Sequence, residues 1–274
     1  MDAPRVTVIV PTRDRPESLE RTLDALARQT LGDSVEVLVV QDGGHDVLGP
    51  LVAGSPHARV IRQDQAGPGA ARNRGAREAR AGVLCFTDDD CEPAADWAER
   101  LEAALEDADA VVGATVNADP SSRVSAASQL VVTHLTEWST GSRAYGPASN
   151  FAARRDVFLE VPFDSARFTF AGGDRDWCDR VHRSGRKLVY APDAVVRHRQ
   201  RLTLRAFVRQ QYAYGRGSYR YRSRHGGSAH FERPSFYSSL VGRAFASGPG
   251  VGLLTLVGQL ANAAGYGREA ARGR

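Results

Sequence analysis

The stretch Val83-Leu-Cys-Phe-Thr-Asp-Asp-Asp-Cys-Glu-Pro93 decides the fold of this chain. Its first five residues are almost all apolar or β-branched and run directly into three carboxylates, a pattern typical of a buried strand that ends at a polar sheet edge. Side chains two positions apart in an extended chain point the same way, so Asp88 and Asp90 can converge on one hard cation. An acidic turn before a helix would look similar, but the preceding strand favours a binding site.

The segments around this stretch alternate between strand and helix patterns. Strands are predicted at 6–10, 35–40, 60–61 and 110–116, and helices at 16–29, 70–79 and 94–105. This alternation implies right-handed crossovers and a largely parallel sheet. Ligands bind at the carboxyl ends of such strands, where Asp42 and Asp88 both fall.

After residue 117 the alternation weakens. The patterns predict a helix at 123–138, a strand at 149–153, a helix at 174–184, and strands at 187–190 and 195–198. A basic, tyrosine-rich helix follows at 202–224. We therefore divide the chain into residues 1–117, residues 118–200 and a basic helical extension over residues 201–274.

Charge is distributed unevenly along the 274 residues. There are 36 basic and 32 acidic side chains, but 14 arginines follow residue 196, with only Glu232 and Glu269 to oppose them. Such a basic tail favours an anionic partner, for example a diphosphate, a phospholipid surface or a nucleic acid. The uncharged run 244–267 contains Pro249 and several glycines, which favours an interfacial or partner-packing helix over a membrane-spanning one.

The three cysteines, Cys85, Cys91 and Cys178, include no CxxC pair. This spacing argues against a disulfide framework or a zinc site and for a reducing compartment. We expect a cytoplasmic protein, and the basic tail is compatible with peripheral association at the inner face of the plasma membrane.

Six motifs, in a fixed order between residues 6 and 198, resemble the family 2 glycosyltransferases of bacterial type. The motifs are VIVPTR at 8–13, VVQDGG at 39–44, AARNRG at 70–75, FTDDDCEP at 86–93, GGDRDWCDR at 172–180 and YAPDAVVRH at 190–198. The resemblance implies an α/β GT-A fold, Rossmann-like, with a mostly parallel central sheet flanked by helices. Residues 1–117 would bind the nucleotide sugar, and residues 118–200 would bind the acceptor and supply the catalytic base.

The same resemblance implies an activity. The enzyme would move a sugar from a nucleotide-diphosphate donor, best taken as a UDP-sugar, to an acceptor hydroxyl with inversion. Mn²⁺ or Mg²⁺ would assist. The acceptor would be a saccharide, a lipid-linked compound or a small molecule, as in cell-envelope polysaccharide synthesis.

The resemblance also assigns a role to each matching residue. Donor binding falls to Pro11, Thr12, Arg13, Asp42, Arg72, Asp88 and Asp89, with Asp42 reaching the base. The metal falls to Asp90, Asp88 and His198, with Asp90 the most direct ligand. Asp174 would be the catalytic base, with Asp176 as the fallback. Acceptor and lid contacts fall to Ser149, Asn150, Trp177, Arg209, Tyr214 and Arg216, and the lid would order on substrate binding.

One departure weakens the assignment of the base. The family commonly has Glu-Asp where this chain has Gly173-Asp174, so the acidic partner is missing. Structural roles also remain open: Asp42 before two glycines suits a turn, and Asp174 suits the first turn of a helix. Thr12, Arg72 and His198 could likewise be ordinary turn, surface and core residues.

Three other classes of protein stay open. A nucleotidyltransferase could use the same sheet and carboxylates, and the missing acid allows a donor-binding protein without turnover. A nucleic-acid-binding protein could use the arginine-rich tail but would not need Asp88 and Asp90, so nucleic acid is disfavoured. Gly67-Pro-Gly69 lacks the Walker lysine and the GxGxxG spacing, which excludes a kinase or dehydrogenase phosphate loop.

Overall fold

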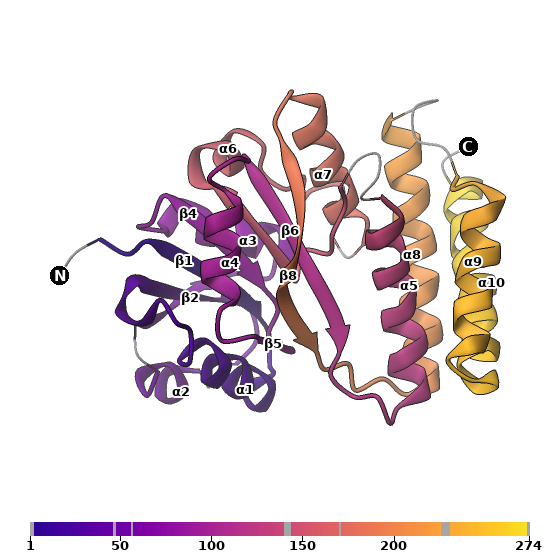
Figure 1. Ribbon diagram of the computed structural model, residues 1–274, viewed down its shortest axis with the longest axis horizontal. Coiled ribbons are helices and arrows are strands. Elements are labelled where there is room, and N and C mark those ends of the chain that lie inside the picture. The colour runs from indigo at the N-terminus through magenta and orange to yellow at the C-terminus, as the bar shows by residue number, and fades with distance from the viewer. Residues whose placement is uncertain are drawn as a thin grey trace.

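The computed structural model describes residues 3–45, 48–55, 57–139, 144–169, 171–225 and 231–272. A central eight-stranded sheet carries helices on both faces, and a helical layer extends from one side (Figure 1). The strands are β1 (Val6–Thr12), β2 (Val35–Asp42), β3 (Ala58–Gln63), β4 (Val83–Thr87), β5 (Cys91–Pro93), β6 (Ala110–Asn117), β7 (Asn150–Arg154) and β8 (Leu188–His198). The helices are α1 (Pro16–Leu26), the 3₁₀ turn η1 (Gly32–Ser34), α2 (Gly49–Ala53), α3 (Pro68–Glu78), α4 (Trp97–Ala104), α5 (Arg123–Ser139), α6 (Arg155–Glu160), α7 (Gly173–Arg183), α8 (Leu204–His225), α9 (Pro234–Ala246) and α10 (Pro249–Arg272).

The sheet is mixed, in the order β3-β2-β1-β4-β7-β6-β8-β5. Strands β3, β2, β1 and β4 run parallel, as do β6 and β8. Strand β7 lies antiparallel between β4 and β6, and β5 pairs antiparallel with the end of β8. Parallel pairing therefore occurs only between strands that a helical crossover can connect. Strands from residues 1–117 and strands from residues 118–200 lie side by side in this one sheet.

Two apolar layers hold the helices to the two faces of the sheet. Leucines of α1, α2 and α4 pack with valines of β1 and β2 on one face. On the other face, α3, α6 and α7 pack on Ile9, Phe86 and Phe151, and the rings of Phe86 and Phe151 stack 4.2 Å apart. The near-continuous burial of β1 and β2 explains why these strands read as unbroken apolar runs.

The two short strands predicted at 187–190 and 195–198 form one strand, β8, with an irregularity opposite Gly113 and Ala114. Asn150 fills this irregularity, because its amide nitrogen donates to the Ala194 carbonyl at 2.9 Å. A Cβ at Gly113 would overlap both Asn150 and the Ala194 carbonyl. Residues 191–194, which the sequence pattern predicted as a break between two strands, therefore lie within the single strand β8.

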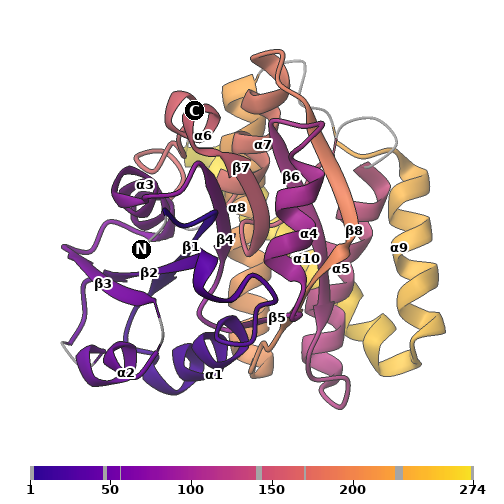
Figure 2. The ribbon, with the colours of Figure 1, turned by 60° about the vertical axis from the view of Figure 1, so that its left-hand side comes forward.

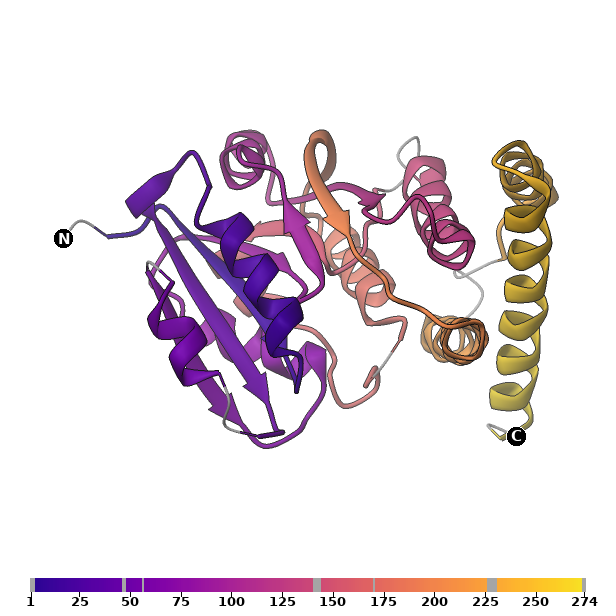
Figure 3. The same cartoon turned by 90° about the horizontal axis from the view of Figure 1, so that it is seen from below.

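The C-terminal extension is helical, as predicted. Helix α8 lies against α10, and α10 also packs on α9 and α5 (Figure 3). The uncharged run 244–267 ends α9 and forms most of α10, and one side of α10 packs on α8, α9 and α5. Among the described residues, no helix combines the length and hydropathy that crossing a membrane requires.

Candidate active site

A cleft of about 700 Å³ opens at the carboxyl ends of β1, β2 and β4. In Figure 2, β1, β2 and α3 lie at the left, and α8 and α10 pass behind the middle of the sheet. The cleft is lined by the ends of these strands, the starts of α3 and α7, and one side of α8. The cleft-lining residues that the sequence predicted are Pro11, Thr12, Arg13, Asp42, Arg72, Asp88, Asp89, Asp90, Ser149, Asp174, His198 and Tyr214.

A second cavity, of about 740 Å³, lies between α5 and the turn from α9 to α10. Arg123 is the charged residue in its lining, and no carboxylate or histidine is among its described lining residues. The carboxylates and histidine that could take part in a reaction therefore line the first cleft and not the second cavity.

Each carboxylate after β4 is paired with a cationic side chain. Asp88 accepts a short hydrogen bond from Arg72, and Asp89 accepts one from the Arg15 guanidinium at 3.1 Å. Asp90 contacts Arg15 at 3.2 Å and, through its other oxygen, His198 Nε2 at 3.2 Å. The triplet is thus a neutralised cluster at the cleft wall.

The Asp90 and His198 pair shifts the pKa of both residues. Burial raises the pKa of Asp90, but the hydrogen bond and charge of His198 outweigh it, so the Asp90 pKa lies below its usual value. Burial lowers the pKa of His198, and the Asp90 hydrogen bond reverses this to a raised value. Burial alone dominates at Asp89, whose pKa rises to about 6 despite Arg15 and Thr12. Both shifts favour the charged forms of Asp90 and His198.

His198 is positioned by two amides on its other ring nitrogen. Nδ1 lies 3.2 Å from Gln129 Oε1 and 2.9 Å from Gln200 Nε2. The Gln129 amide nitrogen donates to the Thr115 carbonyl at 2.9 Å, which turns Oε1 toward the ring. This arrangement directs Nε2 toward Asp90, as an outer-shell partner of a metal-binding histidine does.

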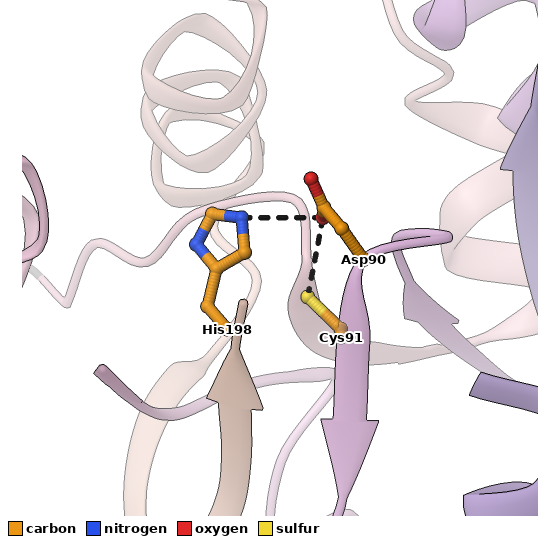
Figure 4. A group of neighbouring side chains, drawn as sticks. All are labelled: Asp90, Cys91 and His198. Atoms are coloured by element: carbon orange, nitrogen blue, oxygen red, sulfur yellow. Dashed lines mark hydrogen bonds and ion pairs between the residues drawn. The ribbon is translucent and has the colours of Figure 1, made fainter. Parts of the chain in front are cut away.

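The residues at this point fit a divalent cation. Asp90, Cys91 and His198 each offer a ligand atom within 4.8 Å of the others (Figure 4). Burial raises the pKa of the Cys91 thiol well above its usual value, so this sulfur is a protonated core group. A carboxylate oxygen and an imidazole nitrogen at a cleft wall suit Mn²⁺ or Mg²⁺ with phosphate and water completing the shell. Asp88, also predicted as a ligand, points to Arg72 instead.

The donor-side residues Thr12 and Asp42 are held by protein groups. Thr12 donates to Asp89 Oδ2 at 2.7 Å. Asp42 accepts from the backbone nitrogens of Ala66 and Gly67, at 2.7 and 2.8 Å, and so shapes the loop that enters α3. The turn role that the sequence left open for Asp42 is therefore filled, while its side chain still lines the cleft.

Asp174 stands at the first turn of α7, and among the described residues no cationic side chain contacts it directly. Its Oδ1 accepts the backbone N–H of Arg175 at 2.8 Å, and its Oδ2 accepts the Tyr145 hydroxyl at 3.1 Å. Burial raises the pKa of Asp174, and these two hydrogen bonds and the more distant Arg72 charge offset this only in part. A carboxylate of this kind is suited to taking up a proton.

The packing around position 173 favours a glycine there. A Cβ at this position would lie 3.2 Å from the Cβ of Phe168 and 3.8 Å from the Phe163 ring. The adjacent Gly172 has a left-handed φ of 86°, and a Cβ there would lie 2.9 Å from the carbonyl of Gly217. A side chain at position 173 would therefore require Phe168 to shift slightly, whereas the conformation of Gly172 itself favours glycine.

Five predicted site residues are not among those that line the cleft, and three of these, Asp176, Trp177 and Asn150, are buried. Asp176 is fully buried and receives Arg180 Nε at 2.7 Å and His225 Nε2 at 3.0 Å. Trp177 lies in the core and donates to the Val161 carbonyl at 2.7 Å. Asn150 accepts the Trp97 indole N–H at 2.8 Å and is fully buried. The structure therefore gives these three residues structural contacts, because the first-turn spacing puts Asp176 and Trp177 on the inner side of α7.

The predicted lid is a continuous helix in the free protein. Of its predicted residues, Tyr214 lines the cleft, whereas Arg209 is exposed and Arg216 pairs with Glu269 of α10 at 2.6 Å. The close approach of α8 and α10 needs glycine, since a Cβ at Gly215 would overlap the Asn262 carbonyl. Helix α8 is thus an ordered wall of the cleft before any substrate binds.

Sequence patterns did not single out several residues of the site. Arg15, Tyr145, Gln129 and Gln200 lie in no motif, and their roles depend on contacts with residues 29 to 75 positions away. Of these residues, only Arg15 could have been expected from the sequence, because it closely follows Pro11 and Arg13 at the predicted end of a strand.

The comparisons with known proteins agree with this geometry. The sequence profile described as Glycosyl transferase family 2 matches residues 7–177, more than half of the chain. Glycosyltransferase AglE of Haloferax volcanii is 29% identical over 224 residues, which are 78% of this chain and 73% of that protein. Pre-mycofactocin glycosyltransferase of Mycobacterium tuberculosis is 28% identical over 236 residues, which are 77% of this chain but only 46% of that protein.

The fold also has a solved counterpart. It resembles the mannosyltransferase PcManGT from Pyrobaculum calidifontis, solved in complex with GDP-Man and Mn²⁺, with a TM-score of 0.60 at 19% identity. The match covers 99% of this chain and 79% of the other. The architecture is therefore GT-A, and the protein is a glycosyltransferase enzyme. By the extent of the profile match, the chain belongs to glycosyl transferase family 2.

Proposed function

We propose that this glycosyltransferase moves a sugar from a nucleoside-diphosphate sugar to an acceptor hydroxyl with inversion, with a divalent cation bound at Asp90 and His198. One observation carries the proposal: a cluster of carboxylates paired with cationic side chains lines the same cleft as Asp174, a half-buried carboxylate that contacts no cation among the described residues. The pKa of Asp90 lies below its usual value and that of Asp174 above it, and such a difference between two carboxylates indicates separate roles in charge binding and proton transfer.

In this reaction Asp174 is the general base. Its carboxylate takes the proton of the acceptor hydroxyl while that oxygen forms a bond to the anomeric carbon from the side opposite the nucleotide. The bond from this carbon to the diphosphate oxygen breaks, and the nucleoside diphosphate leaves. Tyr145 orients the carboxylate through its hydroxyl.

The diphosphate of the donor would bind beside the other carboxylates of the cleft, Asp88, Asp89 and Asp90. When bound there, Mn²⁺ or Mg²⁺ supplies Lewis-acid stabilisation of the leaving group. Arg15 and Arg72 both line the cleft beside this set and would add positive charge. Asp42 and Thr12 lie deeper along the strand ends and would contact the nucleoside.

The donor nucleotide is proposed as UDP on the family resemblance, with GDP as the second candidate because the structural neighbour holds GDP-Man. The acceptor is proposed as a saccharide, a lipid-linked compound or a small molecule. Ser149 and Tyr214 line the cleft and are the residues that we propose for acceptor contacts.

The test is a thermal-shift panel of nucleotide sugars and free nucleotides, each with and without Mn²⁺. A donor at about 100 times its Kd should stabilise the protein by about 2.7 kcal/mol. We expect stabilisation by one nucleoside-diphosphate family, dependent on Mn²⁺ and abolished by Asp90→Ala. Asp193→Ala, at an exposed position of β8, is the matched control and should respond like the wild type.

Product analysis then separates the alternatives. Release of nucleoside diphosphate with a glycosylated product supports the proposal, whereas release of pyrophosphate would indicate a nucleotidyltransferase. A panel in which no nucleotide stabilises the protein would contradict the assignment of the cleft.

A further inference from the structure

The outermost helix carries an apolar surface that faces away from the cleft. On α10, large exposed apolar side chains recur three and four positions apart, and Leu253 and Leu260 are 60% and 72% exposed. A ring of α9 extends the surface, because Phe245 packs against Gly252 beside its start. We call this surface the outer apolar stripe, made of Phe245, Leu253, Leu256, Val257 and Leu260.

The inner side of α10 is already used by the fold. Val251, Thr255 and Gly258 are buried against the neighbouring helices, and Asn262 lines the cleft. In Figures 1 and 3, α10 stands at the edge of the molecule with α8 between it and the sheet. The outer apolar stripe is therefore left over after folding, and an exposed stripe of this size marks an interaction surface.

The charges around the stripe are positive. Arg268 and Arg272 continue the exposed side of α10 beyond it, and Arg233 is exposed just before α9. Arg243 of α9 is exposed too but pairs with Glu137 of α5 at 2.6 Å. Glu269 is the one acidic residue between 233 and 272, and it turns inward to Arg216 and Arg220, at 2.6 and 2.7 Å. The exposed side of the helix pair thus combines apolar and cationic groups with no carboxylate among its described residues.

We propose that this side of α9 and α10 docks on the surface of a bilayer that contains anionic lipid. The stripe enters the boundary between headgroups and acyl chains, and the arginines contact lipid phosphates. Charge complementarity selects this occupant, since a protein partner would have to supply both an apolar groove and a surrounding acidic rim. The cleft opens on the other side of α8 and α10, so the inference does not depend on the reaction proposed above.

The test is flotation of the full chain with vesicles of phosphatidylcholine alone or with about one third phosphatidylglycerol. We expect flotation with the anionic vesicles, weakened by high salt. Leu256→Gln with Leu260→Gln should lower vesicle partitioning about tenfold, and Arg268→Gln with Arg272→Gln should lower it about fivefold for each arginine. Leu159→Gln, at an exposed leucine of α6, is the matched control and should float like the wild type.

Each variant is also assayed for nucleotide-induced thermal stabilisation, which reports on the cleft and on folding. Loss of flotation with that stabilisation intact supports docking through the stripe. Flotation that is unchanged in the double leucine variant, or absent with every vesicle, would overturn the proposal. A concentration-dependent dimer that Leu260→Gln dissociates, without vesicle binding, would assign the surface to a second copy of the chain instead.

Discussion

The carboxylates after β4 and the carboxylate at the start of α7 line one cleft but have opposite surroundings. Asp88, Asp89 and Asp90 each contact an arginine or a histidine, whereas Asp174 is bound by a backbone N–H and a tyrosine hydroxyl. The first set is neutralised by side chains that a bound cation or diphosphate would rearrange. The second is desolvated, and burial raises its pKa. All four residues are aspartates, so residue type does not distinguish them. Contact with a cationic side chain is what separates the carboxylates proposed to bind the metal and diphosphate from the one proposed as the base.

The largest effect is expected from removing the base. Asp174→Asn keeps the size and hydrogen-bonding shape of the side chain but cannot take up the proton, so kcat should fall about 10³-fold. Stabilisation by nucleotide and Mn²⁺ should persist, because the other carboxylate set is intact. The measurement is steady-state turnover with the donor that the thermal-shift panel identifies. Full turnover in this variant would remove Asp174 from the mechanism and break the comparison.

Asp176 tests whether a nearby carboxylate can be purely structural. It is fully buried and contacts Arg180, Arg224 and His225, so Asp176→Asn removes a buried negative charge that two partly buried arginines face. The free energy of unfolding should fall by about 3 kcal/mol. Turnover at a temperature where the variant is folded should stay near that of the wild type.

Urea denaturation measures this loss, with Asp193→Asn as an exposed control that should change the free energy of unfolding by less than about 0.5 kcal/mol. A variant at Asp176 that keeps its stability but loses turnover would transfer the role of base to this residue.

The smallest effect concerns the pH dependence of the base. The Tyr145 hydroxyl stabilises the ionised form of Asp174 and so lowers its pKa against the larger raising effect of burial. Because the base works only when ionised, activity is lost as the pH falls through this pKa. Tyr145→Phe removes the stabilising bond, raises the pKa further and should move the acid limb of kcat/KM to higher pH.

At the acid limb the loss should be about fivefold or less, which is the net value of one hydrogen bond. Well above the limb the variant should approach the wild type. Tyr190→Phe in β8, outside the cleft, is the control. An acid limb that does not move would show that Tyr145 has only a packing role.

Much of the fold could be predicted because it depends on local patterns. The runs at β1, β2 and β4 are mostly apolar, since both of their faces are covered by helices. The acidic triplet that follows β4 and Asp42 at the end of β2 indicated where a ligand binds, because ligands bind at the carboxyl ends of parallel strands. The antiparallel insertion of β7 left no such mark, because pairing between distant strands is decided by the partner and not by the strand itself.

The predicted lid segment is fixed by contacts that its composition did not reveal. Residues 209–216 are basic and aromatic, which suited a segment that orders around an anion. The structure instead joins α8 to α10 through close glycine contacts and through the pairs of Arg216 and Arg220 with Glu269. The partner lies about fifty positions away, so composition alone gave no sign of it.

The sequence by itself determined the α/β class, the family and the edge of the sheet where the chemistry lies, because each rests on short-range periodicity and on ordered motifs. Only the tertiary structure decided which carboxylate has which surroundings. It brought His198 beside Asp90 through the pairing of β5 with β8, and Tyr145 beside Asp174. It buried Asp176 and left the outer face of α10 exposed. The physical reason is that burial and charge pairing are properties of the assembled neighbourhood, which residues far apart in the chain create together.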